Sequence, residues 1–302
     1  MKTKISIILI TVIFAGLVFS CQSLMEAADD SARRAGSAGL IRQERADSIS
    51  ASARAISTAA EQITPEQEYF IGRAVAANIL TTYRVWNGKP ALTAYLNNIC
   101  KAITINSQRP NIYKGYYVAI LDSNEINAFA TSGGHIFITR GLINAAKSEE
   151  ALAAVIAHEV AHIQLRHGIR AIRSSRISQA LLAASSSAVE SITGVDLSQL
   201  TSVFNESVGE IMQTMVKSGY SQAQEYEADN KAMELLASAG YNPSGLVEIL
   251  RELRTAQSRN SGFGKTHPSP AMRISSAERN LASYRVADNS SSRRARFTAA
   301  TR

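Results

Sequence analysis

The sequence predicts an α+β fold that is predominantly helical, with a small β-sheet packed by one helix. Three observations predict this class. Apolar residues recur at helical spacing through most of residues 62–285, the spacing becomes extended only between residues 116 and 139, and a long apolar helical stretch follows the extended part. The chain has 302 residues, of which 45% are hydrophobic and 19% charged, so it can form one large domain or two small ones.

The first twenty residues have the pattern of an export signal. Lys2 and Lys4 precede an uncharged apolar run at residues 5–19, which is short for a spanning helix. The run leads to Cys21, as in the cleavage box of a bacterial lipoprotein, so residues 1–20 are predicted to be a signal peptide and Cys21 to be acylated. The alternative is an uncleaved anchor, and either form ties the chain to a membrane outside the cytoplasm.

The two ends of the chain outside the main domain have biased compositions. Residues 21–61 are rich in Ala, Ser, Arg and Asp, which predicts a tether. Residues 286–302 place arginines among Ser, Ala and Asn, which predicts a disordered basic tail. No recognition motif or aromatic platform accompanies these basic residues, so nucleic acid is not expected as a partner.

The main domain, residues 62–285, begins with two predicted helices. Thr64 can cap a helix that starts at Pro65, and the second helix runs from Pro90 to Ile103. Cys100 lies among apolar residues of that second helix and is expected to be a buried thiol.

Three extended segments then predict the small sheet, at residues 116–121, 127–130 and 135–139. Ser148 can cap the following helix, which has acidic residues in its first turn and which Gly168 is expected to end. This helix turns four apolar side chains toward a core: Leu152, Ile156, Val160 and Ile163.

The second half of the domain is predicted to be helical. Residues 171–220 keep apolar spacing in a Ser/Ala-rich background, which predicts a helical insertion or lid. Ser221 and Gln224 form a capping box for the next helix, and two further amphipathic helices contain Leu250 and Ile274.

The chemistry is concentrated in the sequence His158-Glu159-Val160-Ala161-His162. Residues four apart on a helix share a face, so His158 and His162 can both bind one Zn²⁺. Glu159 projects beside the ion and can act as general base for a zinc-bound water. Two histidines leave a catalytic zinc one protein ligand short, so a third ligand is expected elsewhere.

The residues after this motif do not supply the third ligand. A metzincin would have a third histidine where this chain has Gly168. His167 is turned roughly 140° around the helix from His162, so we expect a helix-end imidazole there.

A later helix offers two glutamates. Glu225 shares a face with apolar residues and is predicted to be the third ligand, whereas Glu227 aligns with Lys231 and is expected to form an exposed ion pair. Asp229 lies one turn after Glu225 and can accept the free N–H of a ligating histidine.

Taken in order, these motifs resemble the gluzincin family of HtpX-like and type I CAAX prenyl endopeptidases, and most of all its soluble bacterial lipoprotein members. The resemblance covers about residues 62–285 and rests on His158-Glu159-x-x-His162, Glu225-x-x-Ala228-Asp229, Asn127-Ala128-Phe129-Ala130, Gly133-Gly134 and His267-Pro268. It implies a zincin-like metalloprotease domain with one Zn²⁺ per chain. The chain stops before the tetratricopeptide repeats of many bacterial members, so a repeat-based partner site is not expected.

The resemblance also implies where a substrate binds. An extended protein substrate adds as a β-strand to an edge before the metal helix, at Asn127, Ala128, Phe129 and Ala130 or at residues 135–138. His267 corresponds to a family histidine near the metal, which stabilises the oxyanion or takes the open coordination position. Arg273 pairs with an active-site carboxylate or only begins the last helix.

Two functions are compatible with these residues. The first is a zinc-dependent endopeptidase that cleaves misfolded or misassembled cell-envelope proteins, with Glu159 activating the zinc-bound water. It would lie on the periplasmic side and be lipid-anchored, and Gln22 favours the outer membrane by analogy with other lipoproteins. The second is a membrane-tethered periplasmic chaperone or assembly factor, whose zinc site is closed by His267 and is not catalytic. Glu159 favours the enzyme, because a structural zinc does not need it.

Overall fold

The computed structural model describes residues 64–170, 208–209, 211–257, 267, 270–284 and 290–302. The chain divides into two compact units, and the described residues from Pro65 onward belong to the unit made of Pro65–Ile172 and Asp196–Arg302. The predicted signal peptide, Cys21 and the tether lie outside the described residues, as does most of the predicted insertion at 171–220. In the part of the chain that is described, no helix is long and apolar enough to cross a membrane.

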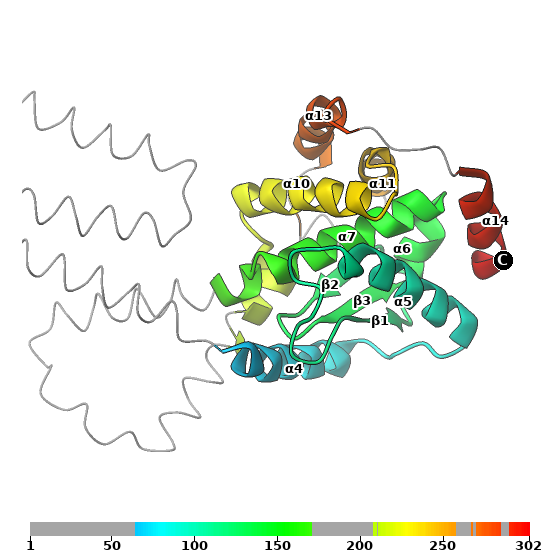
Figure 1. Cartoon of the computed structure of the whole chain (residues 1–302). Helices are drawn as coiled ribbons and strands as arrows, with labels where there is room; N and C mark the ends of the chain where they lie inside the picture. The colour runs from blue at the N-terminus through cyan, green and yellow to red at the C-terminus, as the bar shows by residue number, and fades with distance from the viewer. Residues whose placement is uncertain (1–63, 171–207, 210, 258–266, 268–269, 285–289) are drawn as a thin grey trace, which may run out of the picture. The chain divides into compact units, whose positions relative to one another are not determined.

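The predicted α+β architecture is confirmed, with many helices around one small mixed sheet (Figure 1). The sheet contains β1 (Tyr117–Leu121), β2 (Ala128–Ala130) and β3 (His135–Thr139) in the order β1-β3-β2. β3 pairs with β1 in parallel and with β2 in antiparallel orientation. Among the described strands β2 is therefore at an edge, while the alternative edge at residues 135–138 is wrong because β3 is paired on both sides.

Helix α7 (Glu149–Gln164) occupies the centre of the fold. Ser148 caps it as predicted, since its side chain accepts a hydrogen bond from Ala151 N. All four side chains predicted to face the core are buried, and α7 contacts the sheet as well as helices α5 (Pro90–Ile105), α10 (Gln222–Ser238) and α11 (Ser244–Gln257) (Figure 1). Burial on all sides fixes the helix from which two predicted ligands project.

Helix α4 (Pro65–Thr82) packs against the turn between β2 and β3. The two backbones meet at glycines: a Cβ on Gly72 would lie 2.1 Å from Gly133 N. Gly134 in the same turn has φ +89°, a conformation that glycine adopts without strain. The Gly133-Gly134 motif thus allows close contact between α4 and the turn that joins β2 and β3.

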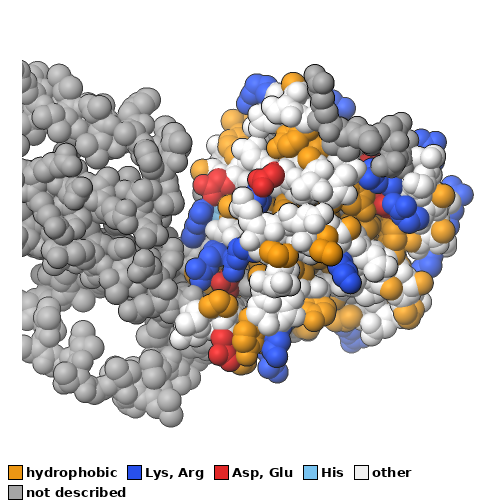
Figure 2. Space-filling view, in the orientation of Figure 1, with side chains coloured by type: hydrophobic (Ala, Val, Ile, Leu, Met, Phe, Trp, Pro, Cys, Tyr) orange, Lys and Arg blue, Asp and Glu red, His pale blue; other side chains and the backbone are white. Residues whose placement is uncertain are grey.

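The remaining elements are α6 (Arg140–Ala145), the π-helical segment η2 (Gln213–Ser218), α13 (Pro270–Leu281) and α14 (Ser290–Thr301). The predicted disordered tail at 286–302 is wrong for residues 290–301, which form α14. Arg296 bonds the buried carboxylate of Glu149 at 2.6 Å and Arg293 contacts Glu150 at 3.3 Å, so two tail arginines hold α14 on the start of α7. On the face seen in Figure 2, other Lys and Arg side chains are scattered among hydrophobic ones.

Candidate metal centre

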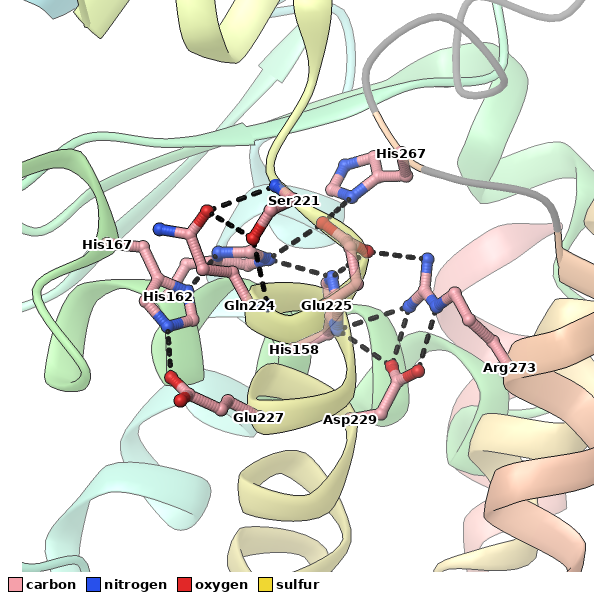
Figure 3. A network of polar contacts seen from close by, with 10 residues as sticks. All are labelled: His158, His162, His167, Ser221, Gln224, Glu225, Glu227, Asp229, His267 and Arg273. Atoms are coloured by element: carbon pink, nitrogen blue, oxygen red, sulfur yellow. Dashed lines mark hydrogen bonds and ion pairs between the residues drawn. The ribbon is translucent and has the colours of Figure 1, made fainter. Parts of the chain in front are cut away.

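Four side chains from three places in the chain converge on one buried point (Figure 3). His158 and His162 project from α7 with their Nε2 atoms 3.0 Å apart. Glu225 on α10 brings Oε2 to 3.6 Å from His158 Nε2 and Oε1 to 3.4 Å from His162 Nε2. His267 Nδ1 lies 2.8 Å from Glu225 Oε1, and the four ligand atoms are all within 4.8 Å of one another.

These separations and donor types fit a zinc ion. Two ligand atoms bound to one tetrahedral zinc stand roughly 3.3 Å apart, since each bond is about 2.0–2.1 Å. The three contacts among His158, His162 and Glu225, at 3.0, 3.6 and 3.4 Å, lie around that value. Two imidazoles and one carboxylate are also a ligand set of catalytic zinc sites. The cluster could therefore hold a metal ion.

Asp229 lies where it was expected, against the far nitrogen of a candidate ligand. His158 Nδ1 is 3.1 Å from Asp229 Oδ1, so its N–H can donate to the carboxylate and leave Nε2 for the ion. Asp229 also accepts two hydrogen bonds from Arg273, from Nε at 2.8 Å and from Nη2 at 2.6 Å.

Arg273 is buried and joins both carboxylates of α10. In addition to its two hydrogen bonds to Asp229, Arg273 places Nη1 2.8 Å from Glu225 Oε2. Burial acts to raise the pKa of Glu225, but the charges of His267 and Arg273 outweigh it and hold the pKa well below the ordinary value. The pKa of Asp229 is lowered in the same way, because Arg273 outweighs burial. Both carboxylates are thus kept ionised.

Glu159 differs from these paired acids. Its side chain is buried beside the cluster, and its Oε1 has no hydrogen-bond partner among the described residues. Burial raises the pKa of Glu159 and makes its carboxylate a stronger base than an exposed one. A carboxylate of this kind beside a candidate metal site can take a proton from a water molecule.

His162 has two neighbours that were not foreseen as part of the site. The ring of Tyr220 stacks on it, with centroids 4.3 Å apart and planes at 20°. His167 Nδ1 lies 2.8 Å from His162 Nδ1, and His167 is fully buried. The expected helix-end imidazole pointing away from His162 is therefore wrong.

The way in which α7 ends explains why His167 lies against His162. The helix ends at Gln164 rather than at Gly168, and Arg166 adopts φ 58°. This left-handed residue turns the chain so that His167 folds back over His162. A helical projection cannot show such a turn, because it assumes that the helix continues.

Glu227 also differs from expectation. It is half-exposed, but it contacts His167 Nε2 at 3.1 Å and Arg170 Nη1 at 2.7 Å rather than pairing with Lys231. Lys231 pairs with Glu234 instead, at 2.8 Å. The choice of Glu225 as the inward glutamate agrees with the geometry, since its side chain is fully buried.

The strand considered for substrate binding lies beside α7. β2 contacts that helix, and the backbone of Phe129 is paired with Phe137 on β3. Ala128 and Ala130 alternate with Phe129, so their backbone groups point away from β3, and both residues are buried. Ala128 N already donates to Asn127 Oδ1 at 3.0 Å, and an added strand would have to displace this contact.

The fold and the cluster together define a metallopeptidase domain with an H-E-x-x-H helix. A family model described as "Peptidase family M48" matches residues 90–281. The chain belongs to this family, and it is a metalloendopeptidase by class.

Three relatives are similar to this chain. The β-barrel assembly-enhancing protease of Escherichia coli (strain K12) is 27% identical over 198 residues, 62% of this chain and 38% of the relative. Metalloprotease LoiP of the same organism is 32% identical over 61% of this chain and 69% of its own length. Mitochondrial metalloendopeptidase OMA1 of Schizosaccharomyces pombe is 28% identical over 62% and 52%. The chain thus spans well under half of the first relative.

Proposed function

We propose that this chain is a zinc endopeptidase that hydrolyses misfolded or misassembled proteins of the cell envelope. The observation that supports this chemistry is Glu159, a buried carboxylate beside a candidate metal cluster, of which one oxygen has no hydrogen-bond partner in the described part of the chain. A metal that only stabilises the fold does not need such a base. The substrate class is supported by the E. coli relative whose name refers to β-barrel assembly.

In this proposal His158, His162 and Glu225 hold the ion. When bound, zinc supplies Lewis acidity that polarises the scissile carbonyl and makes water easier to deprotonate. Glu159 takes the proton from the attacking water on its carboxylate and returns it to the leaving amine. Its burial favours both transfers, since the pKa of Glu159 is raised toward the range in which a carboxyl can give a proton back.

The neighbouring residues prepare this chemistry. Asp229 accepts the N–H of His158 and directs the Nε2 lone pair toward the ion. Arg273 keeps Asp229 and Glu225 ionised in a buried place. We further propose that an extended substrate pairs with the edge of β2 that faces away from β3, at Asn127–Ala130, which would bring its backbone beside α7.

The proposed location is the periplasmic side of the envelope, at the outer membrane, with a lipid on Cys21. The support is the amino-terminal sequence, together with the name of the E. coli relative. Metabolic labelling with a radioactive or clickable fatty acid tests it, because Cys21→Ser should abolish labelling of a chain that is otherwise labelled. Equal labelling of the two chains would contradict acylation at Cys21.

A second function is favoured by one specific contact. His267 belongs to the four-residue ligand cluster, so it can close the site and leave a binding protein without hydrolytic activity. Proteolysis of an unfolded casein by His267→Ala separates the alternatives. Wild-type activity, or activity that appears only in His267→Ala, supports the peptidase; zinc-loaded protein that is inactive in both forms supports the closed site.

The ligand assignment is tested by zinc content after dialysis. We expect Glu225→Gln to lose zinc and activity together, while Glu234→Gln keeps zinc at the wild-type stoichiometry. Glu234 is a matched control because it is an exposed glutamate on the same helix. Full zinc in Glu225→Gln would contradict the assignment.

A further inference from the structure

A line of polar contacts runs from His162 to the molecular surface (Figure 3). His162 Nδ1 meets His167 Nδ1 at 2.8 Å, and His167 Nε2 meets Glu227 Oε2 at 3.1 Å. Arg170 Nη1 completes the line at 2.7 Å from the same carboxylate oxygen. His162 and His167 are buried, whereas about half of the Glu227 side chain is exposed.

The direction of each hydrogen bond follows from the proposed role of His162 as a metal ligand. If Nε2 of His162 binds a metal ion, its proton must sit on Nδ1, which then donates to His167. Nδ1 of His167 must therefore be the unprotonated acceptor, and its proton sits on Nε2. That N–H donates to the Glu227 carboxylate, which is held by Arg170. Every donor in the line thus faces an acceptor.

We propose that His167 and Glu227 are positioning residues that fix the ring orientation and tautomer of His162 for metal binding. The inference rests on the proposed role of His162 as a ligand. It gives His162 an outer support equivalent to the one that Asp229 gives His158. The two supports differ in form, because His158 reaches a carboxylate directly and His162 reaches one through a second imidazole.

Helix α10 explains why both supports arise from one short sequence. Glu225 points into the cluster, Glu227 lies on the side facing His167, and Asp229 lies on the side facing His158. One helix therefore supplies a candidate ligand and the carboxylate ends of both supports. This arrangement ties the orientation of both imidazoles to the position of α10 on α7.

The turn that places His167 is itself held from another element. Arg166 Nε lies 3.1 Å from Glu68 Oε2 on α4, and Arg109 Nη1 donates to the carbonyl of Gln164 at 3.3 Å. These contacts anchor the end of α7 and the left-handed residue that follows it. They make the position of His167 a property of the fold rather than of an unsupported loop.

The line of hydrogen bonds from His162 through His167 to Glu227, called the relay below, is tested by the zinc affinity of the zinc-free full chain. The affinity is measured by competition with a chromophoric chelator at neutral pH. His167→Leu should weaken zinc binding by about 10- to 100-fold, the usual effect of losing such a partner. His167→Gln should recover most of the affinity, since its amide can accept from His162 and donate to Glu227. Glu227→Gln should weaken binding less than His167→Leu, and Glu234→Gln, an exposed glutamate on the same helix, should have no effect.

The outcomes are distinguishable from failure of the ligand assignment. A wild-type chain that binds no zinc would contradict the proposed function, whereas normal affinity in His167→Leu would overturn only the relay. Should His167→Leu fail to fold, Glu227→Gln decides: affinity equal to that of Glu234→Gln overturns the proposal.

A spectroscopic measurement tests the direction of the bonds. Long-range ¹H–¹⁵N correlation spectra of the zinc-loaded Glu159→Gln chain, labelled at histidine, report the tautomer of each ring. We expect protonated Nδ1 in His162 and protonated Nε2 in His167. Protonated Nδ1 in a neutral His167 would overturn the relay, because that nitrogen could then not accept from His162.

Discussion

Arg273 is the buried cation on which the charge balance of the site depends. It lies 2.8 Å from Glu225 and forms a two-pronged contact with Asp229, and all three side chains are buried. Replacing it by methionine keeps much of the apolar stem but removes the cation that contacts both ionised carboxylates. We expect Arg273→Met to destabilise the zinc-free protein strongly.

The magnitude follows from the burial of the partners. Removing one member of a buried ion pair costs about 3–5 kcal/mol, because the remaining charge is uncompensated. The loss should not double for two carboxylates, since Asp229 keeps the N–H of His158 and Glu225 keeps its contact with His267. Arg273→Lys keeps the charge but not the planar fork, so it should lose less.

Urea unfolding of the zinc-free chain at neutral pH measures this loss. Arg251→Gln is the matched control. Arg251 pairs at 2.6 Å with Glu278, which lies on the same helix as Arg273, but the side chains of Arg251 and Glu278 are both exposed. Such an exposed pair contributes about 0–1 kcal/mol. A loss in Arg273→Met no larger than that in Arg251→Gln would show that the two carboxylates do not depend on Arg273 for stability.

Three further predictions concern the supporting framework. Arg296→Gln should lower the free energy of unfolding by about 1–3 kcal/mol, because buried Glu149 loses its cation; a disordered tail would give no change in a urea titration. Burial raises the pKa of Glu68 above 4.5, so its contribution to stability is lost as pH rises through the raised value. Glu68→Gln should therefore become more stable relative to wild type from about pH 4 to about pH 7, and a constant difference would contradict this. Gly72→Ala should lower the melting temperature, since its Cβ would lie 2.1 Å from Gly133 N; an unchanged melting curve would show that the contact yields.

Local signals in the sequence identified much of the fold. The capping box of Ser221 and Gln224 is present as predicted, and the three strands lie within two residues of their expected bounds. Glu225 was separated from Glu227 by helical projection, and the buried position of Glu225 agrees with that choice. Each of these features depends on neighbours within one element, where spacing and residue type are informative.

Other features depend on contacts between distant parts of the chain. The arginine-rich tail has the composition of a disordered segment, but Arg296 and Arg293 pair with Glu149 and Glu150 at the start of α7, and residues 290–301 form α14. His167 was misplaced because the left-handed turn at Arg166 is held by Glu68 on another helix. The order β1-β3-β2, with β3 in the middle, likewise follows from pairing that alternation alone does not specify.

The central claim is that Glu159 is the base of a zinc peptidase. The most direct test is to compare zinc content and cleavage of unfolded casein in wild type and Glu159→Gln. We expect one zinc per chain in both proteins and loss of cleavage only in Glu159→Gln, since the substitution leaves the proposed ligands His158, His162 and Glu225 in place. Full cleavage by zinc-loaded Glu159→Gln would contradict the claim.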